Sequence, residues 1–248
     1  MKVIFRFVNN PGFGDNIRGL ITILQIQKIL KFELEVDFSH HVFSKFFIHK
    51  VDLNAQTDYK QYMFCDENIR NDFLMVEIMN EIETKNILTV STNSYPIIEK
   101  IDKNIKTYLK KLFEVKPEIN EYLHNAISML PVDYHLFHYR LGDDVLINNN
   151  KVNNDVYLQN FETNKKENAV VISDSLAFKQ LFEKCKDVHV FLNTPTHTNQ
   201  EENIDTLIDF LLITKAKSIN CYSVYRWISN FVFWSSIVYD IPLFNIKK

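Results

Sequence analysis

Glycine is the residue type that this sequence most clearly lacks. The 248 residues include only four glycines, whereas an average usage of ~7% would give about 17. Gly12, Gly14 and Gly19 lie within eight residues of one another, and Gly142 stands alone. Glycine is needed where φ is positive or where the backbone closely approaches another group. The two glycine segments are therefore the first candidates for a functional site, and two ordinary tight turns are the alternative.

Other absences exclude whole classes of protein. The sequence has no uncharged apolar run of about 18 residues or more, which a membrane-spanning helix needs. The first residues lack the apolar core and the small-residue cleavage site of a signal peptide. Three widely spaced cysteines give neither a disulfide framework nor the spacing of a zinc site, which is typical of a reducing compartment. These features predict a cytoplasmic protein without a transmembrane segment.

Charge and composition exclude two further classes of protein. The formal net charge is −3 and no basic block is present, so the electrostatic signature of a nucleic-acid partner is missing. A hydrophobic fraction of 46% with this low net charge also excludes a disordered chain. The sequence therefore predicts a folded protein without a nucleic-acid partner.

Strand and helix patterns alternate along the chain, which is typical of a parallel α/β sheet. The predicted strands are 2–8, 33–38, 86–92, 134–139, 169–172, 187–192 and 217–221. The predicted helices are 17–31, 73–83, 96–113, 116–130, 155–162, one after 174, 201–214 and 223–239. The alternation breaks near 114–132. We therefore expect two Rossmann-like, doubly wound parallel sheets that face a cleft, in domains 1–130 and 131–248.

The first glycine segment joins the first strand to the first helix. Its candidate residues are Gly12, Phe13, Gly14, Asp15 and Asn16. Ligands bind beyond the carboxyl ends of parallel strands, and a helix N-terminus offers N–H groups and a positive dipole end. The spacing is neither a dinucleotide fingerprint nor a P-loop. Asp15 could act as a general base, and capping of the helix is the alternative.

The second glycine segment begins at the end of a strand and contains His138, Arg140, Gly142, Asp143 and Asp144. Strand alternation places His138 and Arg140 on the same side. The guanidinium fork fits a diphosphate and keeps its charge, whereas a structural pair of Arg140 with an aspartate is the alternative. Asp143 could hold the arginine or cap the turn. Two adjacent acids without a third ligand favour a solvated turn over a metal site.

Two later segments offer further polar residues after strands. Asp174, which follows Ser173, could accept from a base or a ribose. Ser223, two residues before Tyr225, could donate to a phosphate. For both segments, capping of the following helix is the alternative.

The order of these segments resembles the fucosyltransferase superfamily, which includes α-1,2-, α-1,6- and protein O-fucosyltransferases. The resemblance covers most of the chain. It rests on Gly12 to Arg18, on 112–119, on the His138-x-Arg140-x-Gly142-Asp143 motif, on 171–174 and on 209–223. The motif around Arg140 is the most specific part.

This resemblance implies a GT-B architecture, a GDP-fucose donor, a glycan acceptor, and inverting transfer without a metal or other cofactor. The domain 1–130 would hold the acceptor, the domain 131–248 would hold the nucleotide sugar, and the last helix would pack back on the first domain. Arg140 and His138 would bind the diphosphate. The first choice for the catalytic base is Asp15, and the second is Asp144. The other implied donor contacts are Gly12, Phe13, Gly14, Asn16, Gly142, Asp143, Ser173, Asp174, Ser223 and Tyr225.

The sequence departs from the family pattern at one position, and two alternative functions stay open. Many relatives carry a second arginine where this chain has Leu141, which argues against an α-1,2 or α-1,6 assignment. The same fold could use another nucleotide sugar, such as an activated rhamnose. The chain could also be a non-catalytic nucleotide- or glycan-binding module.

Overall fold

The structure, a computed structural model, describes residues 2–48, 59–63, 72–142, 154–192, 204–225 and 227–246. Its contacts divide the chain into two compact units, Met1–Lys116 and Pro117–Lys248. The sequence-based boundary after residue 130 would put helix α4 (Pro117–Ile127) in the first domain, whereas the contacts group it with the second unit.

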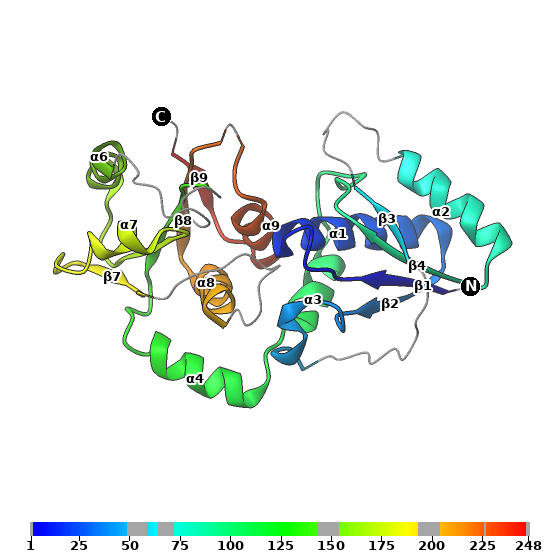
Figure 1. Cartoon of the computed structure of the whole chain (residues 1–248), viewed down its shortest axis with the longest axis horizontal. Helices are drawn as coiled ribbons and strands as arrows, with labels where there is room; N and C mark the ends of the chain where they lie inside the picture. Colours follow the sequence, from blue (N-terminus) through cyan, green and yellow to red (C-terminus); the bar gives the residue numbers. More distant parts are fainter. Residues whose placement is uncertain are drawn as a thin grey trace. The chain divides into compact units, whose positions relative to one another are not determined.

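The first unit contains a four-stranded sheet in the order β2-β1-β4-β3 (Figure 1). The strands are β1 (Lys2–Arg6), β2 (Glu33–Asp37), β3 (Lys60–Tyr62) and β4 (Ile87–Thr92). All three pairings are parallel. The chain leaves β1 toward β2 and returns on the other side of β1, so the strand order reverses between β1 and β4. The short strand β3 was not predicted.

Helix α1 (Phe13–Leu30) packs directly against the end of β4. A Cβ on Gly19 would lie 1.7 Å from the backbone oxygen of Thr92, so only glycine permits this approach. The other helices of this unit are α2 (Asp72–Thr84), α3 (Lys103–Leu112) and the short 3₁₀ helix η1 (Val42–Lys45). Gly19 therefore serves the packing of a helix on a strand.

The helix predicted from residue 96 begins only at Lys103, and this part of the prediction is wrong. The side chain of Gln25 makes hydrogen bonds with both backbone groups of Ile98. Its Nε2 donates to the Ile98 oxygen at 2.8 Å, and its Oε1 accepts from the Ile98 nitrogen at 3.1 Å. These bonds hold the segment in an irregular path along α1. The helix starts where Asp102 caps it and accepts from the nitrogen of Ile105 at 3.0 Å.

The second unit contains a five-stranded parallel sheet in the order β7-β6-β5-β8-β9 (Figure 1). Its strands are β5 (His135–Arg140), β6 (Ala169–Ser173), β7 (Val188–Val190), β8 (Ser218–Ser223) and β9 (Leu243–Asn245). The strand order reverses between β5 and β8. The short strand β9 was not predicted.

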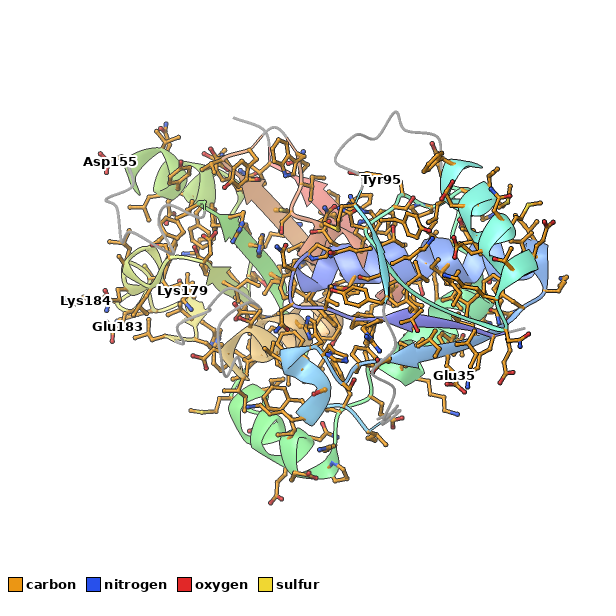
Figure 2. The ribbon with its side chains drawn as sticks, turned by 45° about the vertical axis from the view of Figure 1, so that its right-hand side comes forward. Glu35, Tyr95, Asp155, Lys179, Glu183 and Lys184 are labelled. Atoms are coloured by element: carbon orange, nitrogen blue, oxygen red, sulfur yellow. The ribbon has the colours of Figure 1, made fainter. Side chains whose placement is uncertain are left out.

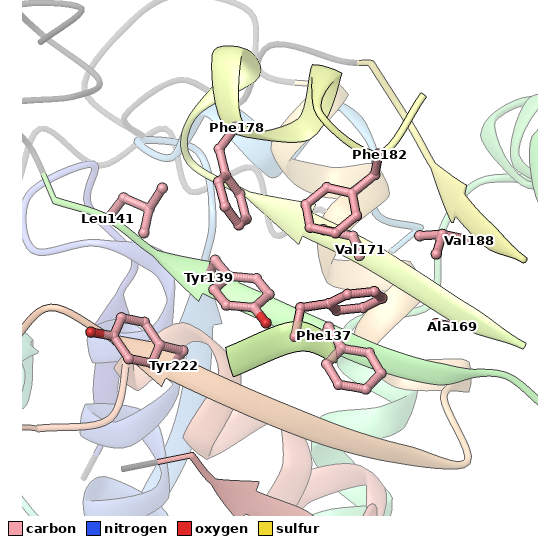
Figure 3. Close-up of a cluster of buried hydrophobic side chains, with 10 residues drawn as sticks. Phe137, Tyr139, Leu141, Ala169, Val171, Phe178, Phe182, Val188 and Tyr222 are labelled. Atoms are coloured by element: carbon pink, nitrogen blue, oxygen red, sulfur yellow. The ribbon is translucent and has the colours of Figure 1, made fainter. Parts of the chain in front are cut away.

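Buried aromatic rings fill one side of this sheet. Figure 3 shows Phe137 and Tyr139 of β5 packed with Phe178, Phe182 and Tyr222. Tyr139 and Phe178 have ring centroids 4.9 Å apart. This packing fixes β5 and β8, the two strands whose ends carry the candidate site, in a rigid core.

The described helices of this unit are α4, α6 (Asn154–Asn164), α7 (Leu176–Gln180), α8 (Ile204–Lys215) and α9 (Asn230–Tyr239). The helix predicted from residue 223 begins at Asn230, because Ser223 is still paired with Arg140 in the sheet and Val224 donates to the oxygen of Arg140 at 3.0 Å. Helix α9 contacts α8 within this unit. Its contact with the first domain stays a prediction. Two parallel α/β sheets confirm the predicted fold class.

Candidate functional site

The candidate site of the second unit lies at the reversal of the strand order. Arg140, the last residue of β5, pairs in register with Ser223, the last residue of β8. In open α/β sheets, ligands bind beyond the carboxyl ends of the strands at such a reversal. The sequence-predicted residues of two separate segments therefore lie side by side at the position where this fold places its ligands.

Asp174 holds the end of β5 from the neighbouring strand. The Asp174 Oδ2 pairs with Nη1 of Arg140 at 2.8 Å. The same carboxylate accepts hydrogen bonds from the backbone nitrogens of Leu141, at 2.8 Å to Oδ1, and Gly142, at 3.2 Å to Oδ2. The Arg140 side chain remains 23% exposed, so its guanidinium can reach a ligand. The sequence left a structural pair between Arg140 and an aspartate open, with Asp143 as the candidate; Asp143 lies outside the described residues, and the structure shows a pair of Arg140 with Asp174.

Burial is the largest influence on the Asp174 carboxyl and raises its pKa. The guanidinium of Arg140 and the N–H groups of Leu141 and Gly142 oppose this effect, because each stabilises the charged form. The guanidinium of Arg140 and these two N–H groups thus help the buried Asp174 carboxyl to keep its charge.

Neither Ser173 nor Asp174 caps helix α7, so the capping alternative for this segment is wrong. The N-cap is Ser175, whose Oγ accepts from the nitrogen of Phe178 at 3.2 Å. Ser173 Oγ accepts from the nitrogen of Ser175 at 3.1 Å and is buried. Asp174 therefore does not cap the helix, and its carboxylate bonds to residues at the end of β5 instead.

His138 is buried beside Cys221, with 3.6 Å between Nδ1 and the sulfur. Burial, with a smaller contribution from Arg140, lowers the pKa of His138 to about 3. Burial raises the pKa of the Cys221 thiol to about 12. Both side chains are neutral near pH 7, so His138 can offer a hydrogen bond but no positive charge.

Gly142 follows Leu141 in a backbone conformation that other residues rarely adopt. Its φ is +115°, and a Cβ there would lie 3.5 Å from the Tyr225 hydroxyl. Glycine is therefore required by the backbone angle rather than by lack of space. The turn after Arg140 is a fixed feature of the site.

Ser223 is the last residue of β8, and Ser229 is the residue that precedes helix α9. Ser223 ends β8, and its Oγ accepts from the nitrogen of Tyr225 at 3.2 Å, so its predicted capping of the last helix is wrong. The N-cap of α9 is Ser229, whose side chain makes no capping hydrogen bond. The Ser229 backbone N–H is bonded to the Cys221 thiol, which contacts His138. The start of α9 therefore lies next to His138.

Sequence reasoning missed Ser229, although Ser229-Asn230 before an apolar run is a recognisable helix start. The first turn of a helix presents N–H groups and the positive end of its dipole, which favour an anion. The second unit thus has the guanidinium of Arg140 at the end of β5 and, two residues earlier on the same strand, a neutral imidazole close to the start of α9. This arrangement suits a diphosphate.

In the first unit, Asp15 is paired with Arg18 near the reversal of the first sheet. Asp15 Oδ1 lies 2.9 Å from Arg18 Nη2, with exposed fractions of 27% and 3% for the two side chains. The guanidinium of Arg18 stacks on the ring of Tyr95, labelled in Figure 2, at 4.0 Å. Gly12, not Asp15, is the N-cap of α1, so the capping alternative for Asp15 is wrong.

The neighbours of Asp15 hold the loop in place. The buried Asn16 side chain donates to the oxygens of Val8 and Pro11, both at 2.9 Å. Phe13 packs in the aromatic core, 5.0 Å from the ring of Phe43. These contacts explain both residues structurally, and direct contact of either with the donor stays a prediction.

Gly12 and Gly14 differ from the other two glycines. Gly12 has φ −61°, and nothing lies within 4 Å of where its Cβ would be, so neither strain nor crowding requires glycine there. Gly14 is buried in the first turn of α1. Their predicted contacts with the donor remain predictions.

Asp143 and Asp144 lie outside the described residues. Within the described part of the chain, no group of three or more His, Cys, Asp or Glu side chains could hold a metal ion. None of the described helices combines the length and the apolar character needed to cross a membrane.

No protein-family model and no curated protein sequence matches the chain. Solved structures do match in fold. A mutant fucosyltransferase FUT1 of Arabidopsis thaliana, in complex with GDP, has a TM-score of 0.61 at 11% identity over 100% of this chain and 70% of that chain. The α-1,6-fucosyltransferase NodZ soaked with GDP-fucose, an enzyme from Bradyrhizobium, gives 0.60 at 12% identity over 98% and 93%.

A more distant likeness extends to POFUT1 in complex with GDP, with a TM-score of 0.52 at 12% identity over 100% of this chain and 98% of that chain. At such identities the likeness shows the fold alone. It confirms the predicted GT-B class and the resemblance in fold to fucosyltransferases.

Proposed function

We propose that this protein is an inverting glycosyltransferase that transfers fucose from GDP-fucose to a hydroxyl group of a glycan. The observation that carries the proposal is the position of Arg140, which is paired in register with Ser223 and held by Asp174 at the strand reversal of the second sheet. It occurs in a fold whose solved examples include fucosyltransferases bound to GDP or GDP-fucose.

In the donor site, Arg140 and the N–H groups at the start of α9 bind the diphosphate. Negative charge grows on GDP as its bond to the sugar breaks, and donors fixed in advance stabilise that charge more in the transition state than in the substrate. His138 adds a neutral hydrogen bond, and Ser223, Ser229 and Tyr225 surround the phosphates. Asp174 positions Arg140 and is the candidate contact for the nucleoside.

In the transfer step, the acceptor oxygen attacks the anomeric carbon of fucose from the face opposite GDP. The new C–O bond forms as the bond to the β-phosphate oxygen breaks, and GDP leaves with the electron pair. Asp15 takes the proton of the acceptor hydroxyl. Its side chain is 27% exposed and is held by Arg18, so it is fixed yet accessible. Asp144 is the second choice for the base.

Nucleotide titration tests the donor. Calorimetry with GDP, UDP, ADP and TDP should show preferential binding of GDP, and preference for UDP or TDP would favour a transferase for another nucleotide sugar. Arg140→Lys keeps the charge but loses the fork, so it should bind GDP better than Arg140→Ala and worse than the wild type. Unchanged circular dichroism and melting in both variants would control for folding.

Release of GDP from GDP-fucose separates an enzyme from a binding module. Hydrolysis or transfer that disappears in Arg140→Ala supports catalysis, whereas GDP-fucose binding without any turnover supports the module. Turnover that survives excess EDTA would support a metal-independent reaction. The glycan acceptor and the cytoplasmic location remain predictions.

A further inference from the structure

The connection between β8 and α9 is fastened to the turn that carries Arg140. Val224 donates to the backbone oxygen of Arg140 at 3.0 Å, and the nitrogen of Tyr225 donates to Ser223 Oγ at 3.2 Å. The Tyr225 hydroxyl lies 3.5 Å from the position that a Cβ of Gly142 would take. The first residues of this connection therefore have a defined place beside the candidate anion site.

Two aromatic rings of this connection stack on each other. The ring centroids of Tyr225 and Trp227 are 5.1 Å apart, and their planes differ by only 11°. Trp227 is nevertheless 59% exposed. Because Tyr225 covers one face of the indole, this exposure places the other face in solvent. An open indole face beside a polar site offers a surface on which a flat ligand ring can stack.

We propose that Trp227, backed by Tyr225, is the platform on which the purine base of the nucleotide stacks. This inference rests on the proposed function, because it takes the diphosphate to be bound at Arg140 and the start of α9. A purine offers a wide planar face, and a parallel pair of rings is extended most simply by a third flat ring. Stacking of this kind depends on the area of the base rather than on hydrogen bonds.

Binding of GDP and of inorganic pyrophosphate by the whole protein tests the platform. Trp227→Ala should weaken GDP binding about tenfold, within the range expected for removal of one base–aromatic stack, and leave pyrophosphate binding unchanged. Trp227→Phe should restore most of the GDP affinity because it keeps an aromatic ring. Phe244→Ala is the matched control: this ring of β9 is also exposed, at 50%, and should not affect either ligand.

Fluorescence gives an independent measurement, because the chain has two tryptophans and Trp234 is buried in α9. GDP should quench the wild-type emission, and this quenching should be absent in Trp227→Phe at saturating GDP. Pyrophosphate should not quench either protein.

The outcomes separate this inference from the function beneath it. If the wild type does not bind GDP, both fail. If GDP binds through Arg140 but its affinity and quenching do not depend on Trp227, the platform is refuted and the donor proposal stands. If Trp227→Ala weakens pyrophosphate as much as GDP, the residue supports the phosphate site and the base lies elsewhere. Loss of transfer with unchanged GDP binding would instead assign Trp227 to the acceptor sugar and overturn the inference.

Discussion

Arg140 and Asp174 come from the ends of neighbouring strands and form an ion pair of 2.8 Å between Nη1 and Oδ2. The same carboxylate accepts from the backbone nitrogens of Leu141 and Gly142. The buried Asp174 side chain therefore holds both the guanidinium of the candidate diphosphate site and the backbone that follows Arg140.

Asp174→Asn should weaken both folding and nucleotide binding. The amide cannot satisfy Arg140 and two backbone donors as a carboxylate does, so we expect a loss of about 1–3 kcal/mol in the free energy of unfolding. GDP affinity should fall about tenfold because the guanidinium is no longer held. Urea denaturation and calorimetry measure the two effects. Asp187→Asn, the same change at an exposed position, is the control, and a wild-type GDP affinity in Asp174→Asn would refute the positioning role.

Gly19 and Gly12 should differ sharply in their tolerance of alanine. Gly19→Ala places a Cβ 1.7 Å from the Thr92 oxygen, and the helix must move away from β4. We expect a loss of about 2 kcal/mol or more despite the better helix propensity of alanine. Gly12→Ala meets nothing within 4 Å and should change stability by about 1 kcal/mol or less. Urea midpoints compare the two, and equal midpoints would contradict the packing of α1 on β4.

Stability should depend on pH through the buried histidine of the second unit. In the unfolded state His138 has the ordinary histidine pKa of 6.5, whereas burial in the folded state lowers the pKa of His138 to about 3. Stability from this group is complete above pH 6.5 and is lost as the pH falls toward 3, because the unfolded state then binds more protons. The wild type should therefore lose stability relative to His138→Gln by about 1.4 kcal/mol per pH unit in this window.

Urea titrations between pH 7.5 and pH 5 measure that difference, and parallel curves for the two proteins would show that His138 is accessible to protons when folded. His41 is a second histidine whose pKa burial lowers to about 3. It packs 5.0 Å from the ring of Phe43 in the other unit. It adds the same slope to both proteins and cancels in the comparison.

Much of the fold follows from local sequence patterns. Strands β1 and β6 are short runs of β-branched and other apolar residues that turn residues follow, and the alternation of strands with helices predicts parallel sheets. The strand reversal at Arg140 and Ser223 then places two distant segments together. Both segments could be found because their polar residues directly follow predicted strands.

Other features depend on contacts that no local pattern contains. The sequence predicts that the last helix starts at Ser223, but Ser223 is paired with Arg140 in the sheet and the helix begins at Asn230. Likewise, the pairing of Arg140 with Asp174 joins residues 34 apart in the chain. The Asp15–Arg18 pair, in contrast, could be predicted from the sequence, because residues three apart share a helix face.

Asp15 and Arg18 provide the last prediction. Asp15→Asn keeps an oxygen that can accept from Arg18 but cannot take a proton from an acceptor hydroxyl. We therefore expect GDP affinity to stay at the wild-type value and the melting temperature to fall, because the buried Arg18 guanidinium loses its charged partner, while the rate of fucosyl transfer to a panel of glycan acceptors falls by about 10²–10⁴. Arg18→Lys keeps the charge and loses the fork on Asp15 and the stacking on Tyr95, so it should give an intermediate rate. Wild-type transfer by Asp15→Asn would move the role of base to Asp144, whose own replacement by Asn should then abolish transfer.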